Sequence, residues 1–311
     1  MPQTLPLRTL VRRVFTVGAL LMAPPLWATT ATCSPTALST GRCALYVDAS
    51  GAANGTPASL GPETRGGSAF PVDLAGSFLF AAASSRFEVS GVATFGWLSN
   101  RVSVVAGTTG VDNAPNVAAV ANLNLYFSDR LTFVDASQPP GTLGTAYASV
   151  AVTGGVGASP AIYPFNESRA TAQVVTNGAA VSVAAYGDRP GTGGIPSIIT
   201  FALPVRFNSM DFTSLNVQLG TSALASALNI PAAIYAASAN ANFASGVEWL
   251  GIDRVVDANG NTVTGWTVQS ASGFDYAQSY ASQAIPEPAS AVLLLLGIGV
   301  VMSFRALKPR A

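Results

Sequence analysis

Apolar and polar residues alternate along several segments of the chain, and this alternation predicts β-strands. In the segment ANLNLYFSDRLTF, the polar residues Asn122, Asn124 and Arg130 occupy even positions. The odd positions hold the apolar residues, which are Leu123, Leu125, Phe127, Leu131 and Phe133. Because successive side chains of a strand point to opposite faces, the pattern predicts a strand with one buried face.

Three further segments show the same period of two. In IITFALPVRF the predicted buried residues are Ile199, Phe201, Leu203, Val205 and Phe207. In LNVQL they are Leu215, Val217 and Leu219. In RFEVSGVATFGWL they are Phe87, Val89, Phe95 and Trp97, provided that Gly91 marks an irregularity in the strand.

Turn-forming residues separate the predicted strands. They are Pro139-Pro140-Gly141, Asn177-Gly178, Pro190-Gly191 and Asn259-Gly260, and Asn-Gly favours a type I′ hairpin. The best helix candidate is residues 221–234, and long loops are expected at 153–164 and 187–196. Many half-buried strands separated by turns predict an all-β fold. We expect a β-sandwich, and a jelly-roll-like arrangement is one form that it can take.

The composition narrows the chemistry that the chain can perform. Charged residues make up only 10% of the sequence, against roughly 25% in ordinary soluble proteins. The chain has no histidine, which excludes Ser-His-Asp and Cys-His nucleophile systems and His-based zinc sites. Its single lysine, Lys308, lies close to the C-terminus. We therefore expect no metal, no cofactor and no enzymatic activity.

The net charge of zero conceals an uneven distribution. Six of the fifteen basic residues lie in the two terminal segments, so the body between them carries nine arginines against fourteen acidic residues, a net charge of −5. The body therefore lacks the basic stripe that nucleic-acid binding requires.

The N-terminal 31 residues have the pattern of a secretory signal peptide. Arg8, Arg12 and Arg13 form a positive region, Val14 to Trp27 form an apolar region, and small residues follow from Ala28 to Ala31. The alternative is a short N-terminal helix of a cytosolic domain. Export would place the body in an oxidising compartment.

Two cysteines, Cys33 and Cys43, follow the predicted signal peptide. In an oxidising compartment a pair that closes a short loop is expected to form a disulfide. The alternative is lipidation of Cys33, although the preceding residues lack a leucine-rich lipobox.

The C-terminal segment, residues 285–311, combines three features. Pro286, Glu287 and Pro288 precede an uncharged and mostly apolar run from Ala289 to Phe304. Basic residues follow, and these are Arg305, Lys308 and Arg310. Sixteen helical residues span about 24 Å, which is short of the roughly 30 Å hydrocarbon core but sufficient if basic side chains snorkel. The positive-inside rule orients the tail to the cytoplasm and the body outside.

This combination resembles the PEP-CTERM sorting signal. The resemblance implies a membrane processing enzyme, an exosortase, which reads Pro286-Glu287-Pro288 and moves the protein to the cell surface or beyond it. A plain single-pass anchor is the alternative. The expected organisation is a signal peptide at 1–31, a secreted β-rich body at 32–284, and a sorting signal with a transmembrane helix at 285–311.

The body also resembles a recurring, mostly uncharacterised body domain of PEP-CTERM proteins. The likeness rests on YFSDRLTF, residues 126–133, and on residues 239–276, which end in SASGFDY. It implies a secreted β-rich domain and assigns no activity.

Several residues are candidates for a site within the body. Asp257, Asn259 and Asn261 superficially resemble a calcium loop, but the glycine is misplaced for an EF-hand and a hairpin turn is favoured. A glycosidase would need two converging carboxyl groups, and the candidates are Glu63, Glu88, Glu167 and Glu248. Sugar rings could stack on tryptophans, and the candidates are Trp97, Trp249 and Trp266.

The sequence therefore predicts a non-enzymatic, exported protein of the cell envelope or extracellular matrix. Its expected partners are an exosortase-like enzyme and, through the C-terminal helix, the membrane. The alternative is a carbohydrate-binding module associated with exopolysaccharide, which requires an exposed aromatic platform beside Asn or Asp side chains.

Overall fold

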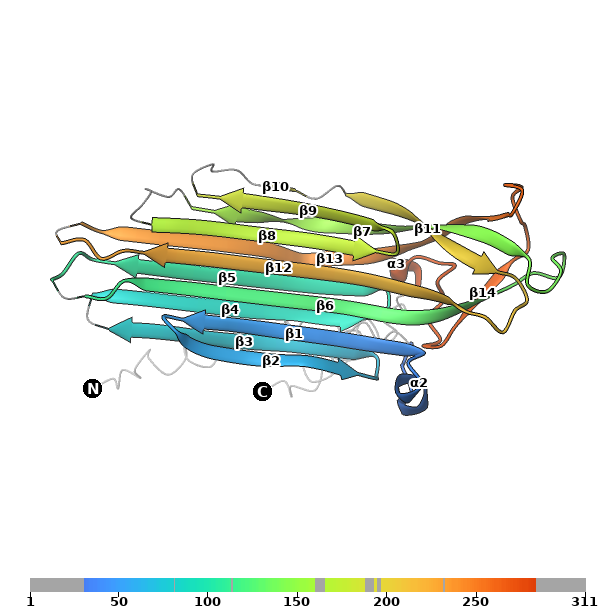
Figure 1. The fold of residues 1–311 in the computed structure, drawn as a ribbon, viewed down its shortest axis with the longest axis horizontal. Helices are drawn as coiled ribbons and strands as arrows, with labels where there is room; N and C mark the ends of the chain where they lie inside the picture. The colour runs from blue at the N-terminus through green and yellow to red at the C-terminus, as the bar shows by residue number, and fades with distance from the viewer. Residues whose placement is uncertain are drawn as a thin grey trace, which may run out of the picture. The chain divides into compact units, whose positions relative to one another are not determined.

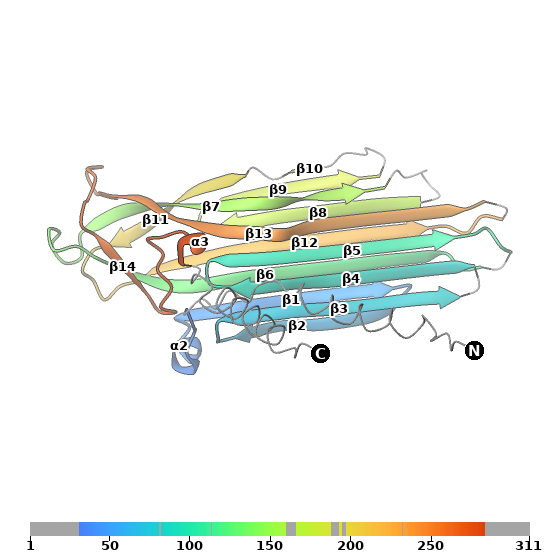
Figure 2. The same ribbon diagram turned by 180° about the vertical axis from the view of Figure 1, so that it is seen from behind.

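Two antiparallel β-sheets pack face to face around one hydrophobic core (Figures 1 and 2). The computed structural model describes residues 31–283, except for residues 81, 113, 160–165, 188–192, 195–196 and 232. Residues 1–30 of the predicted signal peptide and the whole predicted sorting signal lie outside the described residues. The predicted all-β sandwich is confirmed.

The first sheet has the strand order β2-β1-β6-β12-β8-β9, and β14 also pairs with β6. Its strands are β1 (Cys43–Ala53), β2 (Thr56–Arg65), β6 (Val117–Val134), β8 (Asn166–Thr176), β9 (Ala179–Tyr186), β12 (Thr213–Ala227) and β14 (Thr267–Ser270). Figure 1 looks onto this sheet.

The second sheet has the strand order β10-β7-β13-β5-β4-β3, and β11 also pairs with β7. Its strands are β3 (Ala69–Phe80), β4 (Ala83–Thr94), β5 (Trp97–Thr108), β7 (Leu143–Ala158), β10 (Gly193–Gly194), β11 (Ile198–Arg206) and β13 (Tyr235–Asp257). Two short helices, α2 (Pro35–Ser39) and α3 (Tyr280–Gln283), lie close to the ends of the described chain.

The alternating residues form the core as predicted. The five apolar residues of β6, from Leu123 to Phe133, are at most 1% exposed, and the predicted residues of β11 and β12 are buried in the same way. Most strands turn one row of side chains, mainly apolar, to the facing sheet and the other row outward, which is the arrangement of antiparallel sheets with one solvated face.

The hairpin between β4 and β5 corrects one prediction. Phe87, Val89 and Phe95 are buried as expected, but Trp97 is only half-buried and belongs to the outward-facing row of β5. Gly96, with φ +83°, makes the turn that separates the two strands. The buried row of β5 therefore begins at Leu98, one residue later than the alternation of β4 would place it.

The predicted helix at 221–234 is wrong, because residues up to Ala227 continue strand β12. Small alanines at 223, 225 and 227 are buried between the sheets, while the intervening residues face outward. Alanine has high helix propensity, but its small side chain also fits closely approaching sheets, and tertiary packing decides the outcome here.

The expected turns and loops are confirmed in part. Residues 139–141 connect β6 to β7, and Asn177-Gly178 connects β8 to β9. The predicted loop at 153–164 begins later than expected, because β7 continues to Ala158. Most of the predicted loop at 187–196 lies outside the described residues. The type I′ turn occurs at Asn54-Gly55, where φ is +45° and +81°.

Within residues 31–283, excluding the gaps given above, no helix has the length and apolar character needed to cross a bilayer. The predicted span from Ala289 to Phe304 is not among the described residues.

Candidate functional site

Asp129 interrupts the apolar row of β6 and is the most extensively bonded acidic residue of the described body. Its side chain points into the core, where the residue is 2% exposed. One carboxylate oxygen, Oδ1, accepts hydrogen bonds from the backbone N–H groups of Arg130, Ala271 and Ser272, at 2.9, 3.1 and 3.3 Å. The other, Oδ2, accepts from the hydroxyl groups of Ser272 and Tyr276. A buried carboxylate requires such a set of donors.

The segment that reaches Asp129, residues 270–276, is shaped by its own short side chains. The Ser270 hydroxyl donates to the carbonyl of Phe274 at 2.8 Å, and the N–H of Phe274 donates to Ser272 Oγ at 3.2 Å. Gly273 has φ +80°, a conformation that favours glycine. The sequence SASG therefore forms a tight turn that directs Ser272 and Tyr276 inward.

Aromatic residues surround the inner end of this segment. Tyr276 is fully buried and meets Trp249 edge to face, with ring centroids 5.1 Å apart. The Trp249 indole N–H donates to the Tyr276 carbonyl at 3.0 Å. Phe274 and Phe127 pack on the same tyrosine ring, at 4.7 and 6.5 Å. We call Asp129, Ser272, Tyr276 and Trp249 the latch, because together they attach the C-terminal segment to the sandwich.

Burial changes the ionisation of the latch. Desolvation raises the pKa of Asp129 to about 6, although the hydrogen bonds from Ser272, Tyr276 and Arg130 oppose the change. Desolvation and the neighbouring carboxylate also raise the pKa of Tyr276 well above its ordinary value. Tyr276 is therefore a neutral donor at every physiological pH.

The N-terminal end of the body joins the same region. The N–H of Thr32 donates to the Ser272 carbonyl at 2.8 Å, and Cys33 and Gly67 exchange two backbone hydrogen bonds. Cys33 and Cys43 form the predicted disulfide, with Cα atoms 5.7 Å apart. In the pairing of β1 with β6, Cys43 lies directly opposite Asp129. The latch and the disulfide thus lie together at one end of the sandwich.

The last described residues are also attached to the body. Tyr280 stacks on Trp97 at 6.2 Å, and the Ala281 N–H donates to Glu248 Oε1 at 3.2 Å. The Gln283 amide group donates to the Asp275 carbonyl at 2.6 Å and accepts from the Asp275 N–H at 3.1 Å. Ordered contacts therefore continue to Gln283, three positions before Pro286.

The latch joins the two segments that carry the body resemblance, residues 126–133 and 239–276. Neither Asp129 nor Ser272 was a candidate site residue. The signal that could have identified Asp129 is its position, because the alternation of β6 places residue 129 in the buried row. An acidic residue in such a row indicates a partner elsewhere in the chain.

The turn interpretation of residues 257–261 is confirmed. The Asp257 carboxylate accepts from the N–H groups of Asn259 and Asn261 and from the Asn261 side-chain amide, at 2.9, 2.8 and 3.1 Å. These bonds, led by the Asn261 amide, lower the pKa of Asp257. Only Gly260 has positive φ in this loop, so the predicted type I′ geometry is wrong, and Gly260 follows a tight turn instead.

The four glutamates lie on four different strands. Glu63 on β2 pairs with Arg65 at 2.6 Å, and Glu88 on β4 pairs with Arg86. Glu248 on β13 accepts from Ala281, and Glu167 is exposed on β8. Local arginines and backbone groups account for the contacts of the first three. Among the described residues, no group of three or more Cys, Asp or Glu side chains is placed to hold a metal ion.

The three tryptophans do not form a shared exposed platform. Trp249 is fully buried in the latch. Trp266 is partly buried against Phe133, with ring centroids 6.2 Å apart, and Trp97 is covered on one side by Tyr280. The exposed platform of Trp249 and Trp266 that the alternative of a carbohydrate-binding module requires is therefore not formed by these residues.

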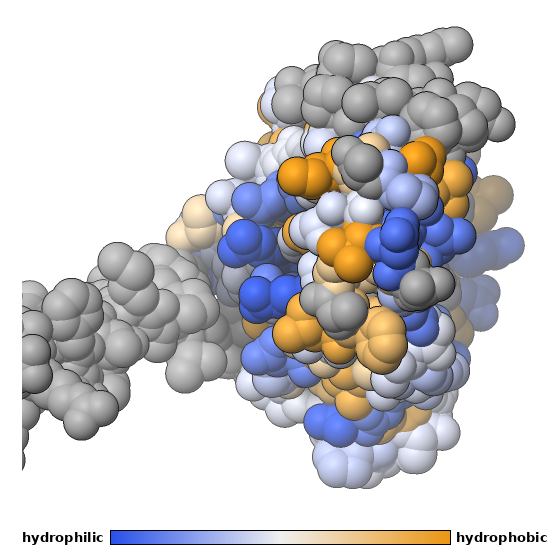
Figure 3. Space-filling view, turned by 90° about the vertical axis from the view of Figure 1, so that its left-hand side faces the viewer, coloured by the Kyte–Doolittle hydropathy of each residue, from blue (hydrophilic) through white to orange (hydrophobic). Residues whose placement is uncertain are grey.

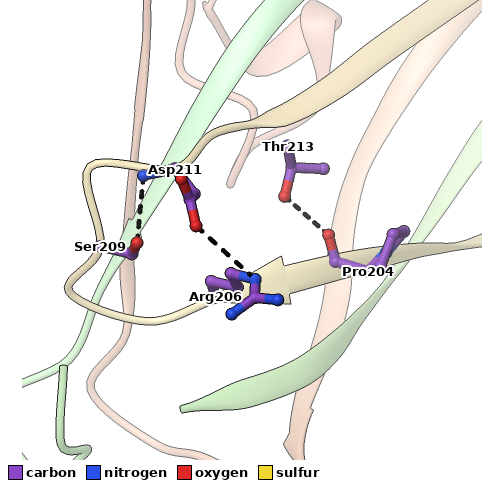
Figure 4. A network of polar contacts seen from close by, with 5 residues as sticks. All are labelled: Pro204, Arg206, Ser209, Asp211 and Thr213. Carbon is purple, nitrogen blue, oxygen red and sulfur yellow. Dashed lines mark hydrogen bonds and ion pairs between the residues drawn. The ribbon is translucent and has the colours of Figure 1, made fainter. Parts of the chain in front are cut away.

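An open hollow of about 580 Å³ lies beside the loop between β11 and β12. Figure 4 shows its polar groups, in which Arg206 approaches Asp211 at 3.8 Å and Thr213 donates to the Pro204 carbonyl at 2.7 Å. The Asp211 N–H donates to Ser209 Oγ at 3.0 Å. Arg206 and Asp211 are well exposed, so their pairing contributes little to stability. The hollow contains no pair of converging carboxylates.

The opposite end of the sandwich from the latch carries exposed apolar side chains on its connecting segments. Figure 3 views this end and shows apolar patches among hydrophilic residues. The exposed apolar residues at this end are Leu79 and Phe80 at the end of β3, and Val111, Leu228 and Ile234 in the connecting segments.

Comparison with protein-family models, with curated proteins and with solved structures finds no match to this chain.

Proposed function

We propose that the chain is a non-enzymatic, exported protein of the cell envelope or extracellular matrix, and that an exosortase-like enzyme sorts it through Pro286-Glu287-Pro288. In this proposal the C-terminal helix holds the protein in the membrane with the body outside, until processing moves it to the cell surface or releases it. We also propose that an N-terminal signal helix and a C-terminal transmembrane helix flank the body, and that the sandwich has a jelly-roll-like arrangement.

The observation that carries the proposal is the attachment of the C-terminal segment through Gln283. Asp129, Trp249 and Asp275 hold residues 270–283 by hydrogen bonds. The contacts that attach this segment to the body therefore end before Pro286-Glu287-Pro288, which we call the PEP segment. A cut at or beyond Pro286 would leave every one of these contacts intact. A sorting signal that is removed from a folded protein needs such a boundary.

The disulfide supports export. Disulfides are typical of oxidising compartments outside the cytoplasm. The cysteine pair lies beside the latch, so the two ends of the body that bear the predicted targeting segments are stabilised together.

Cell fractionation tests the sorting step. The wild-type chain is expressed in a bacterium that has an exosortase, beside a double variant with Pro286→Ala and Pro288→Ala. Pro140→Ala, in the exposed β6–β7 loop, is the matched control. We expect wild type and control at the cell surface or in the medium, and the double variant in the inner-membrane fraction. Equal distribution of all three proteins would exclude recognition of the motif and leave a plain anchor.

A further inference from the structure

The outward face of the first sheet carries a block of neutral hydrogen-bonding side chains. Strands β1, β6, β12 and β8 are paired in register, so their outward residues form rows across the sheet. The three central rows are Tyr46-Tyr126-Gln218-Val175, Asp48-Asn124-Gly220-Gln173 and Ser50-Asn122-Ser222-Thr171. We call these twelve residues the polar face. Asp48 is its only charged member.

The second sheet provides an internal comparison. Its outward rows on β3, β4, β5 and β13 are Asp73-Ser90-Arg101-Asn242, Ala75-Glu88-Ser103-Asn240 and Ser77-Arg86-Val105-Ser238. These twelve positions hold four charged residues and no aromatic residue. The polar face thus holds one charged residue where these rows of the second sheet hold four, although Arg169 and Glu167 of β8 lie just beyond its last row.

Two tyrosines form a wall on the polar face. Tyr46 and Tyr126 stack across β1 and β6, with ring centroids 4.5 Å apart and planes inclined by 14°. Beside Tyr126 lies an open hollow of about 350 Å³, within the size range of small-ligand sites. Its other lining residues are Ser128, Val175, Thr176, Asn177, Asn216 and Gln218.

The amides next to this wall are available for a ligand. Within the described chain, the side chains of Asn124 and Gln218 make no hydrogen bond to another residue. Gly220 lies beside Asn124, and a Cβ there would come within 2.7 Å of Asn124 Oδ1. The glycine thus leaves space for the amide to lie across the sheet.

We propose that the polar face binds a neutral polysaccharide. A sugar hydroxyl both donates and accepts hydrogen bonds, and so does a side-chain amide. The C–H face of a sugar ring packs on an aromatic ring, which the tyrosine wall supplies. A nearly uncharged surface offers no attraction to polyanions, so glycans that carry uronate or sulfate groups are expected to bind more weakly. This inference rests on the proposed non-enzymatic role and gives the body a ligand class.

Binding measurements on the full chain test the inference independently of sorting. The protein is purified in a detergent without a sugar head group and titrated with dextran, mannan, galactan and soluble cellulose oligomers, beside alginate as the acidic glycan. We expect saturable binding to at least one neutral glycan and at least tenfold weaker binding to alginate. Binding to none of the neutral glycans, or preference for alginate, would overturn the inference even if sorting occurs as proposed.

Three variants locate the site. Asn124→Ala and Tyr126→Ala should each weaken binding about tenfold, since each removes a ligand contact. Gly220→Ala should weaken it about fivefold by displacing the Asn124 amide, which is the flexible end of a side chain and yields without disturbing the sheet. Asn240→Ala, on the outward face of the second sheet, is the matched control and should bind as wild type does.

Circular dichroism melting establishes that each variant is folded. Unchanged binding in folded Asn124→Ala and Gly220→Ala would place any glycan site elsewhere and contradict the inference. An equal loss in Asn240→Ala would contradict it as well.

Discussion

At the residue scale, the organising feature is one acidic side chain in a row of apolar ones. Asp129 is buried, yet each of its carboxylate oxygens accepts hydrogen bonds. Besides the neighbouring N–H of Arg130, the donors belong to residues 271–276, more than 140 residues away along the chain. This distance explains why the sequence pattern could identify the row but not the partner. A single buried acid therefore specifies where the C-terminal segment attaches.

Two substitutions of Asp129 should separate the effect of its hydrogen bonds on stability from the effect of its charge. Asp129→Ala leaves the N–H of Ser272 and the hydroxyl of Tyr276 without a partner, and we expect it to lower the free energy of unfolding by about 3 kcal/mol or more. Asp129→Asn retains an acceptor and can donate to the two hydroxyl oxygens, so a change within about 1 kcal/mol is expected at pH 7. Urea unfolding of both variants checks this, and equal destabilisation by the two would contradict the role of the hydrogen bonds.

The raised pKa of Asp129 predicts a pH dependence of stability. Between its ordinary value of 3.8 and its folded value of about 6, the folded protein holds the proton more tightly than the unfolded chain. This contribution to stability is complete below about pH 4 and is lost as the pH rises through 6, amounting to roughly 2–3 kcal/mol. Urea unfolding between pH 4 and 8 measures it. Asp129→Asn should lack this component while retaining the pH dependence of all other groups, and identical curves for the two proteins would refute the assignment.

At the element scale, strands are set by local alternation, and their ends are set by particular residues. The buried rows of β6, β11 and β12 follow directly from period two, whereas the shift at Gly96 and the continuation of β12 depend on packing between sheets. Glycines also create space within strands. A Cβ at Gly51 or at Gly76 would lie 2.3 or 2.4 Å from the ring of Phe87, so this ring occupies space that two glycines leave open.

Loss of the disulfide should weaken the N-terminal attachment. Cys33 and Cys43 close a short loop, and the chain-entropy model predicts that the double substitution Cys33→Ala, Cys43→Ala lowers the free energy of unfolding by about 2–3 kcal/mol. Thermal unfolding with and without reductant checks this. Reductant should lower the midpoint of wild type and leave that of the double variant unchanged. If reductant also lowered the midpoint of the double variant, its effect would not come from this disulfide.

At the scale of the whole body, the latch and the disulfide make one end of the sandwich the place where its terminal segments are secured. The all-β class, the core rows and the cysteine pair were predictable because each depends on local pattern or on few candidates. The latch and the polar face were not, since both depend on which strands become neighbours. Strand order brings Asp129 to Ser272 and aligns Tyr46 with Tyr126, and alternation alone does not determine strand order.

Two truncations should distinguish the body from the segment that follows it. A chain that ends at Gln283 keeps all latch contacts and is expected to unfold at the same temperature as the full chain. A chain that ends at Gln269 loses the buried rings of Phe274 and Tyr276 and should lose about 4 kcal/mol or more, by comparison with large-to-small core substitutions. Calorimetry compares the two, and equal midpoints would mean that residues 270–283 do not complete the fold.

The most direct test of the proposed sorting is the C-terminal sequence of the protein recovered from the cell surface or the medium, determined by mass spectrometry of the intact chain and its C-terminal peptide. We expect a terminus at or close to Pro286-Glu287-Pro288, with Gln283 and the whole latch retained. If all of the surface-located protein instead ends at Ala311, the chain is not processed at the PEP segment and the proposed sorting is wrong.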